Sequence, residues 1–256
     1  MNEISLAIEG QSLSKEFGNR PVLRRLDLAV PAGTCLGLTG ANGSGKTTLL
    51  RCLAGLVRPT AGRVLWFGTP ALNRPERRRL IGMVAHDSRL YPQLTLRENL
   101  VFAARMHGLA EPRRCADGLL EQIGLAAHAD CRPAHISRGL QQRMAFARAV
   151  IHAPAILLLD EPFSGLDAEG SRWLATQLCV LRDQGRTICF SSHDPARMEQ
   201  VADVIYELRG GRLAAVAAPL RPDRPSDPRP ASAEAAQGRP SGPFTVFGST
   251  PVREAA

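Results

Sequence analysis

Residues 40–47 read Gly40-Ala41-Asn42-Gly43-Ser44-Gly45-Lys46-Thr47, which fits the pattern G-x-x-x-x-G-K-[ST]. The mostly apolar residues 34–39 before them are typical of a buried strand, and residues 47–56 after them are typical of a helix. Glycines let the backbone wrap around a polyphosphate with its N–H groups pointing inward, and the positive end of the helix faces the same anion. The pattern can arise by chance, but its place between a strand and a helix favours a phosphate-binding loop.

This loop supplies the expected nucleotide ligands. Lys46 is expected to reach the outer phosphates, and the Thr47 hydroxyl is suited to Mg²⁺. The full set expected to bind the nucleotide is Gly40, Ala41, Asn42, Gly43, Ser44, Gly45, Lys46, Thr47 and Thr48.

Three polar side chains follow two other predicted strands. Asp160 and Glu161 end the apolar run 156–159, and His193 follows the strand expected at 187–191. At the carboxyl ends of parallel strands, Asp160 is expected to hold Mg²⁺ through water and Glu161 to polarise an attacking water. His193 is expected to reach the terminal phosphate. The alternatives are two acids that end a strand and cap the next segment, and a histidine that is only hydrogen-bonded.

The alternation of strands and helices predicts an α/β fold with a mostly parallel core sheet, an N-terminal antiparallel β region and a helical sub-lobe. Strands are expected at residues 4–8, 26–30, 63–67, 81–85, 156–159, 187–191 and 204–208. Residues 88–153 form the sub-lobe, with Leu140, Met144, Ala147 and Ile151 on one helix face. One domain is expected over residues 1–218, followed by a disordered Pro/Arg/Ala-rich tail at 219–256.

Composition limits the possible functions. The net charge is +8, but the basic residues are spread along the chain, so nucleic-acid binding is not expected. The six cysteines form no C-x-x-C pair, which argues against a zinc or dithiol site. No apolar stretch is long enough to cross a bilayer and no secretory signal is seen, so we expect a cytoplasmic protein that reaches a membrane through a partner.

With these motifs in this order, the chain resembles the ATP-binding subunits of ABC transporters over about residues 4–215. Ser164, Gly165, Leu166 and Asp167 resemble the D-loop of that family, and His193 its switch histidine. Phe17 matches the aromatic residue that stacks on adenine, although it can also be plain core. The resemblance implies a P-loop NTPase fold, with ATP and Mg²⁺ as ligands.

Residues 136–143 resemble the family's signature sequence, which holds the ATP of the opposite subunit. Ser137 can cap the helix that starts there, so that its hydroxyl and the free N–H groups near Gly139 face a γ-phosphate. The alternative is an ordinary amphipathic helix with a serine cap. The resemblance implies a shared site, in which one subunit offers residues 40–48, Asp160, Glu161 and His193 and the other offers Ser137, Arg138 and Gly139.

Three positions depart from the family's usual spelling. Arg138 replaces a glycine and Leu140 a glutamine, while His86 stands where a glutamine senses Mg²⁺ and water. Arg138 can act as a cation near the γ-phosphate or point into solvent, and we expect solvent. These spellings resemble the haem-exporter type that serves cytochrome c maturation, or the ABC-2 exporter type.

The implied function is that of an ATP-hydrolysing subunit that dimerises with ATP and drives a separate integral membrane permease, from the inner face of the membrane. The permease is expected to dock near residues 87–105, with Tyr91, Leu94 and Leu96 as candidate apolar contacts, although all three can also be ordinary core. Soluble ABC proteins acting on ribosomes or DNA usually have two ATP domains or a coiled-coil insertion, and this chain shows neither. An unrelated P-loop kinase would leave the Ser137 segment without a role. Glu161 and His193 argue against a catalytically dead regulatory subunit.

Overall fold

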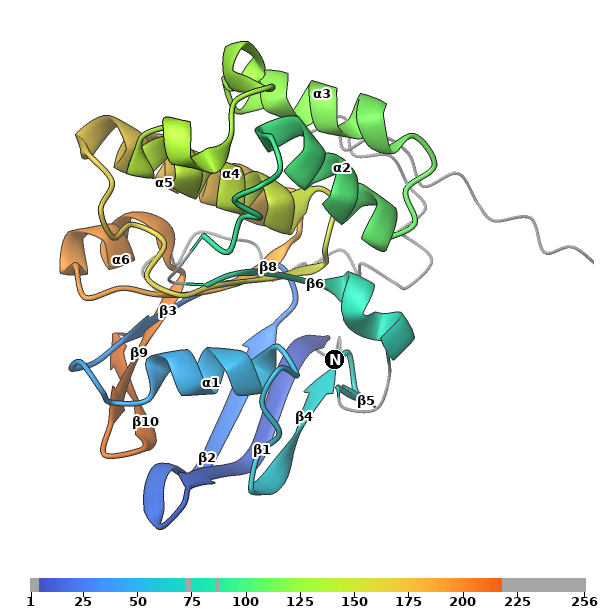
Figure 1. The fold of residues 1–256 in the computed structure, drawn as a ribbon. Coiled ribbons are helices and arrows are strands. Elements are labelled where there is room, and N and C mark those ends of the chain that lie inside the picture. The colour runs from blue at the N-terminus through green and yellow to red at the C-terminus, as the bar shows by residue number, and fades with distance from the viewer. Residues whose placement is uncertain (1–4, 72–74, 86–87, 218–256) are drawn as a thin grey trace, which may run out of the picture.

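A computed structural model describes residues 5–71, 75–85 and 88–217 of the chain. Two β-sheets and two groups of helices form its layers (Figure 1). Helix α1 (Lys46–Leu53) lies between the two sheets, and the helical layer covers the other face of the larger sheet (Figure 1). The buried apolar side chains accordingly form two clusters, one under the helical layer and one around α1.

The smaller sheet is antiparallel and comes mainly from the N-terminal part of the chain. Its strands are β1 (Leu6–Phe17), β2 (Arg20–Pro31), β4 (Ala61–Trp66) and β5 (Thr69–Pro70), in the order β2-β1-β4-β5. Buried and open residues alternate along β2, as expected for a sheet with one face on the core. The predicted antiparallel β region is therefore confirmed, although β1 and β2 are longer than the two short strands predicted there.

The larger sheet carries the residues of interest. It runs β10-β9-β3-β8-β7-β6, with β3 (Cys35–Thr39), β6 (Ile81–Val84), β7 (Ile156–Leu159), β8 (Thr187–Ser191), β9 (Val204–Arg209) and β10 (Arg212–Ala217). The pairs among β6, β7, β8, β3 and β9 are all parallel, which confirms the mostly parallel core sheet. The sequence analysis missed β10, which a Gly210-Gly211 turn folds back onto β9. Both glycines have positive φ, as tight hairpin turns require.

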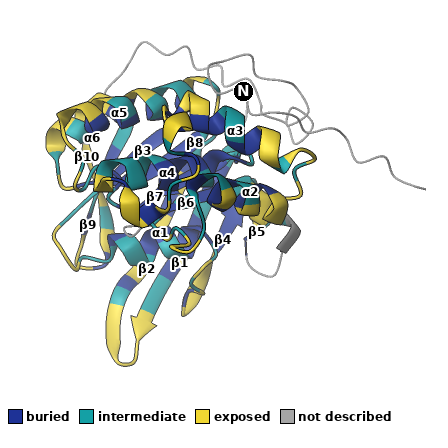
Figure 2. Cartoon of the chain, turned by 45° about the horizontal axis from the view of Figure 1, so that its top comes forward, coloured by how far each residue is buried: buried dark blue, intermediate teal, exposed yellow. Residues whose placement is uncertain are grey.

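The helical layer contains α2 (Leu96–Met106), α3 (Pro112–Gln122), α4 (Arg138–Val150), α5 (Ala168–Asp183) and α6 (Pro195–Val201), with short 3₁₀ turns at Pro75–Leu80, Ala126–His128 and Pro133–His135. Met144, Ala147 and Ile151 are buried, as the predicted helix face requires (Figure 2). Helices α4, α5 and α6 pack on strands of the larger sheet, whereas α3 packs on α2. Within the described ranges, no helix is both long and apolar enough to traverse a bilayer.

For Leu96 the structure decides between the two alternatives in favour of core. Leu96 was a candidate for apolar contact with a permease, but it is fully buried at the start of α2. The reason is local. Thr95 caps α2 and accepts the Glu98 N–H, while the Glu98 carboxylate accepts the Thr95 N–H, and this capping box turns Leu96 into the core.

Candidate functional site

The loop between β3 and α1 has a backbone that only glycine adopts easily. Gly40, Gly43 and Gly45 have φ values of 143°, 76° and 109°. A Cβ on Gly40 would lie 2.5 Å from the Leu208 carbonyl oxygen, and one on Gly45 would lie 2.9 Å from a Val22 methyl group. The glycines are therefore required by conformation and by close packing.

Lys46 is the first residue of α1, and its ammonium lies inside the loop. The side chain is 7% exposed, and its Nζ donates to the carbonyl oxygens of Gly40 at 2.7 Å and Ala41 at 3.3 Å. Glu161 Oε1 lies 3.9 Å from the same Nζ. The loop, the helix N-terminus and one carboxylate therefore meet around a buried cation, which is a suitable environment for phosphate groups.

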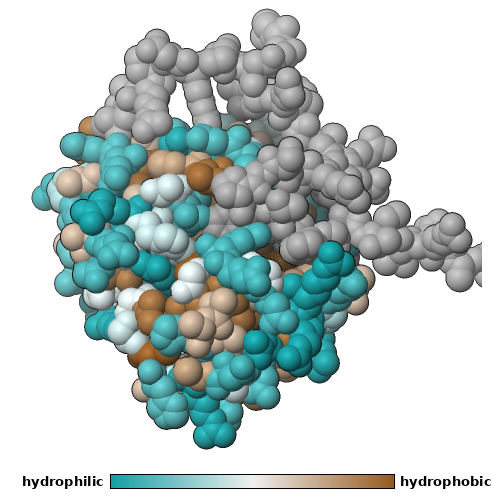
Figure 3. Space-filling model, turned by 90° about the horizontal axis from the view of Figure 1, so that it is seen from above, coloured by the Kyte–Doolittle hydropathy of each residue, from teal (hydrophilic) through white to brown (hydrophobic). Residues whose placement is uncertain are grey.

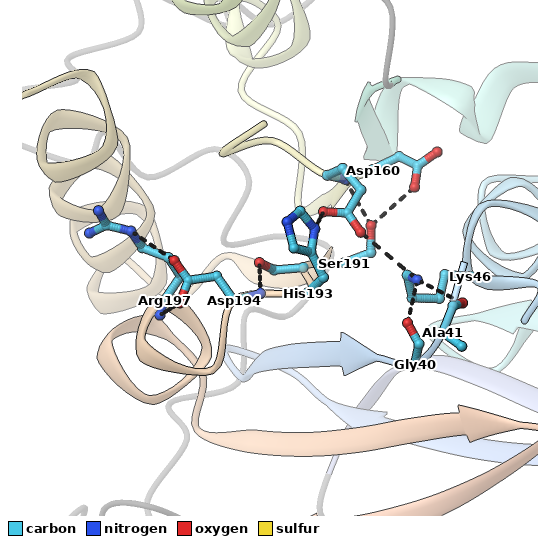
Figure 4. A network of polar contacts seen from close by, with 10 residues as sticks. Gly40, Ala41, Lys46, Asp160, Ser191, His193, Asp194 and Arg197 are labelled. Atoms are coloured by element: carbon cyan, nitrogen blue, oxygen red, sulfur yellow. Dashed lines mark hydrogen bonds and ion pairs between the residues drawn. The ribbon is translucent and has the colours of Figure 1, made fainter. Parts of the chain in front are cut away.

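Asp160, Glu161 and Ser191 form a hydrogen-bonded group at the ends of β7 and β8 (Figure 4). The Ser191 hydroxyl donates to Asp160 Oδ1 at 3.0 Å and accepts the Glu161 N–H at 2.8 Å. Asp160 and Ser191 are 1% and 0% exposed. A single buried hydroxyl thus fixes both acids that the sequence analysis singled out.

Glu161 has a strained backbone, and its carboxylate lies near both Lys46 and His193. Its φ is 50°, in the left-handed region that costs a residue with a side chain about 1 kcal/mol or more. His193, which follows β8, has Nδ1 3.0 Å from Glu161 Oε2. The parallel strand order brings together Lys46, Glu161 and His193, which are up to 147 residues apart in the sequence (193 minus 46).

The side chains present fit a divalent cation and a polyphosphate. Asp160 Oδ2 is buried and has no hydrogen-bond partner among the described residues, and the same is true of Ser44 Oγ in the loop. Buried polar atoms normally have hydrogen-bond partners. Oxygen atoms such as Asp160 Oδ2 and Ser44 Oγ are suited to Mg²⁺ and its waters. Thr47 is half-buried in the first turn of α1, beside Lys46.

Comparison with known proteins decides the family. A model of the family described as "ABC transporter" matches residues 23–164, more than half of the chain. The chain belongs to the ABC transporter family. The prediction of an ABC ATP-binding domain with the fold of a P-loop NTPase is thereby confirmed.

Several relatives show how far the similarity to this ABC chain extends. A sulfate/thiosulfate import ATP-binding protein of Synechococcus elongatus is 37% identical over 88% of the chain and 66% of its own length. An Fe(3+) ions import ATP-binding protein of Brucella melitensis is 38% identical over 82% of the chain and 60% of its length. The chain thus spans less than two thirds of both relatives. A Nod factor export ATP-binding protein of Burkholderia lata is 35% identical, over 83% of the chain and 71% of its length.

A solved structure supports the same assignment. A dimeric ATP-binding cassette in a post-hydrolysis state, bound to ADP and Pi, superposes with a TM-score of 0.76 at 27% identity. The match covers 84% of the chain and 99% of that protein. The superposition places the described ABC chain in the fold of an ATP-binding cassette.

The segment of this ABC chain that resembles the signature sequence lies at the tip of α4. Ser137 is the N-cap residue and its hydroxyl accepts the Leu140 N–H at 3.3 Å, which confirms the predicted cap. Ser137 and Arg138 are exposed and Gly139 is half-buried. The Arg138 side chain does not simply extend into solvent, because its guanidinium lies over Gly165.

The D-loop residues form a tight turn between β7 and α5. The Ser164 N–H donates to the Glu161 carbonyl oxygen at 3.1 Å, and Gly165 has a φ of 74°. Asp167 caps α5 by accepting the Gly170 N–H at 2.7 Å. This structural task of Asp167 exists within one chain, whether or not a second subunit is present.

Of two further predicted residues, the structure describes only Phe17. Phe17 is 54% exposed at the end of β1, with Lys15 Nζ 4.9 Å from its ring centroid, so it is not core. An exposed ring beside a cation is available for stacking. His86 lies outside the described residues, as does the predicted tail at 219–256.

Sequence reasoning missed two residues of the site. Ser191 ends β8 and Gln142 lies on α4, where its Nε2 donates to the Pro162 carbonyl oxygen at 3.1 Å. Ser191 precedes the singled-out His193 by two residues, and a polar residue at the end of an apolar strand was the available signal. No local pattern indicates the Gln142 contact.

Apolar side chains are also exposed on the sub-lobe. Tyr91, Phe102 and Met106 are 46%, 40% and 71% exposed, and the Tyr91 and Phe102 rings are in edge contact with centroids 5.0 Å apart. Figure 3 views the molecule from the side of the helical layer and shows brown apolar residues among teal polar ones. Leu94, another predicted contact, is half-buried.

Proposed function

We propose that this chain is the ATP-binding and hydrolysing subunit of an ABC transporter and powers a separate membrane permease. The observation that carries the proposal is the meeting of Lys46, Asp160, Glu161 and His193 at adjacent strand ends, next to the glycine-rich loop. This arrangement contains a phosphate-binding loop, a metal-binding carboxylate and a base, which are the parts that nucleotide hydrolysis requires.

Each side chain has a separate task in this proposal. Residues 40–48 bind the phosphates, with Lys46 on the outer ones. Thr47 and Asp160 would hold Mg²⁺, which neutralises charge on the phosphate oxygens when bound. Glu161 accepts a hydrogen bond from the attacking water and orients it. His193 holds the Glu161 carboxylate and stabilises charge on the terminal phosphate.

The working unit is an ATP-dependent dimer of ATP-binding domains. Ser137, Arg138 and Gly139 form the tip of α4, where Ser137 and Gly139 complete the site of the opposite domain. Phe17 stacks on the adenine, and Ser164, Gly165, Leu166 and Asp167 lie at the contact between domains. ATP contacts both domains through its terminal phosphate, whereas ADP lacks that phosphate. Hydrolysis therefore removes the contacts that favour the closed dimer.

The partner is an integral membrane permease, and this chain binds it from the inner face of the membrane. Tyr91, Phe102 and Met106 form an exposed apolar surface of the kind that a partner helix covers. His86, at the position of the family's glutamine, would take over its task of sensing Mg²⁺ and water.

The cargo is the finer part of the proposal. The signature and the histidine at position 86 favour an exporter, of the haem type for cytochrome c maturation or of the ABC-2 type. The Burkholderia relative named for Nod factor export supports the export direction, whereas the relatives named for sulfate/thiosulfate and Fe(3+) support import. Identifying the membrane protein that co-purifies with the chain from its native membrane would decide between these cargoes.

A single substitution tests the core of the proposal. Glu161→Gln keeps the size of the side chain but removes the base, so Mg·ATP is expected to lock the protein in a dimer with turnover reduced about 100-fold or more. Light scattering and ATPase assays with and without Mg·ATP measure both effects. Glu207→Gln, on β9, is the matched control and should leave both unchanged. A Glu161→Gln protein that stays monomeric at saturating Mg·ATP, alone and with its permease, would contradict the proposal.

A further inference from the structure

The side chain of Arg138 is packed against the D-loop of its own chain. A Cβ atom placed on Gly165 would lie 2.7 Å from Nε, 2.8 Å from Cζ and 3.1 Å from Cδ of Arg138. The guanidinium group thus occupies the space that a side chain at position 165 would enter. Gly165 also has a φ of 74°, so glycine is favoured there by conformation, and a methyl group at this position would displace the guanidinium of Arg138.

Two neighbouring contacts join the same two segments. A Cβ on Gly139 would lie 3.7 Å from Leu166 Cδ2, so the Leu166 side chain lies close to the first turn of α4. Gln142 donates from Nε2 to the Pro162 carbonyl oxygen at 3.1 Å. Arg138 and Gln142 of α4 therefore lie against Gly165 and Pro162, and the Leu166 side chain lies beside Gly139 between them.

The segment from Pro162 to Leu166 directly follows Glu161, the residue with the strained backbone. The Ser164 N–H bonds back to the Glu161 carbonyl oxygen at 3.1 Å, and the Leu166 N–H to that of Phe163 at 3.3 Å. A displacement of Gly165 is therefore passed to the backbone of Glu161 through a turn of only four residues. The flat guanidinium can cover the glycine face, which a lysine ammonium cannot do.

We propose that Arg138 is a positioning residue that clamps the Ser164–Asp167 turn to the tip of α4 within one chain, and thereby fixes the backbone that carries Glu161. The inference rests on the proposed function for its effect on hydrolysis. It assigns Arg138 a task within its own chain, in place of a charge offered to the triphosphate of the opposite domain.

The first test uses the monomer without nucleotide, so it does not depend on hydrolysis. In Arg138→Ala, hydrogen exchange of the Ser164 and Leu166 amides is expected to quicken at least about threefold, because the clamp that holds the turn is lost. Exchange along β8 should not change. Arg172→Ala, which removes an exposed arginine from α5, is the matched control. Unchanged exchange at residues 164–166 in Arg138→Ala would overturn the proposal.

The second test is a double-mutant cycle on ATP hydrolysis. Gly165→Ala places a methyl group where the guanidinium lies, and Arg138→Ala removes the guanidinium. If the two substitutions acted independently, their fold-changes in kcat would multiply. The kcat of the double variant is expected to be at least about fivefold higher than that product predicts, with KM for ATP changed less than twofold. Additive effects would overturn the proposal. So would a fall in kcat of about 1,000-fold or more in Arg138→Ala with unchanged exchange in the monomer, as a charge acting in the opposite site requires.

The proposed function and the role of Arg138 can be disproved independently. If the wild-type protein hydrolyses no ATP, the proposed function fails, while the exchange experiment still decides whether Arg138 holds the turn. If the wild type hydrolyses ATP and the cycle is additive, only the role of Arg138 is wrong.

Discussion

His193 Nδ1 lies 3.0 Å from Glu161 Oε2, and Lys46 Nζ lies 3.9 Å from the other carboxylate oxygen of the same residue. Glu161 is thus held between a histidine from the end of β8 and a lysine from the start of α1. Its carboxylate is 18% exposed, whereas His193 is 71% exposed. The acid is held in place and the histidine remains open to a ligand.

His193→Ala should separate hydrolysis from binding. Without the imidazole, the Glu161 carboxylate loses a hydrogen bond and the terminal phosphate loses a contact, so kcat is expected to fall about 100-fold or more. ATP affinity should change little, because residues 40–48 are untouched. Steady-state ATPase assays and nucleotide titration measure the two quantities. His193→Gln, which can still donate to Glu161, should recover part of the activity, and full activity in His193→Ala would exclude this role.

Ser191→Ala removes the hydroxyl that joins Asp160 and Glu161. The Glu161 N–H then lacks its partner, and unfolding should become easier by about 1–3 kcal/mol. Turnover should fall too, because the strained φ of Glu161 is no longer supported. Urea unfolding and ATPase assays test both effects. Ser192→Ala is the control, because that hydroxyl accepts the Asp194 N–H and joins neither acid among the described residues. Equal behaviour of the two variants would contradict the role assigned to Ser191.

Asp160→Asn is expected to stabilise the fold while it impairs function. The substitution removes a buried charge that has one unpartnered oxygen, and the amide oxygen can still accept from Ser191. The free energy of unfolding without ligand should therefore rise by about 1 kcal/mol or more. Mg²⁺ should no longer strengthen ATP binding. Thermal unfolding and ATP titration with and without Mg²⁺ measure this. A destabilised variant that still responds to Mg²⁺ would refute it.

A stacked histidine pair predicts a pH dependence of stability. The rings of His107 and His152 are parallel, with centroids 3.6 Å apart. Burial, together with the neighbouring His107, lowers the pKa of His152 from 6.5 to about 4, and burial also lowers the pKa of His107. The unfolded chain therefore binds a proton at His152 more readily than the folded chain. The contribution of His152 to the free energy of unfolding is fully present above about pH 6.5, and it is lost as the pH decreases toward about 4.

The size of this effect is measurable. Between pH 8 and pH 5, His152 should reduce the free energy of unfolding by about 2 kcal/mol. His152→Gln can keep the hydrogen bond that Nε2 makes with the Ile81 carbonyl oxygen, and it does not titrate. Urea unfolding of both proteins across this range isolates the contribution, because the carboxylates are common to both. Parallel curves for the two proteins would show that His152 does not titrate on unfolding.

Much of the fold could be predicted because the local signals agree. The glycine-rich loop, the apolar strands at 156–159 and 187–191, and the helix after Ser137 were all identified from residue type and spacing. The β10 strand was missed because its residues are small and mostly exposed, so no apolar alternation marks it. The sequence left Leu96 open between a surface contact and core, because a capping box, and not hydrophobicity, sets which way the first turn of α2 faces.

The sequence by itself determined which residues can bind phosphate, metal and water, since the glycine spacing, Lys46 and the acids after an apolar strand follow from local chemistry. Only the tertiary structure decided which side chains touch. Ser191 bridges the two acids, His193 meets Glu161, and Arg138 covers Gly165 because parallel strand order and helix packing bring distant segments together. Such contacts depend on sheet register and on the direction of a side chain, and no pattern along the chain specifies either.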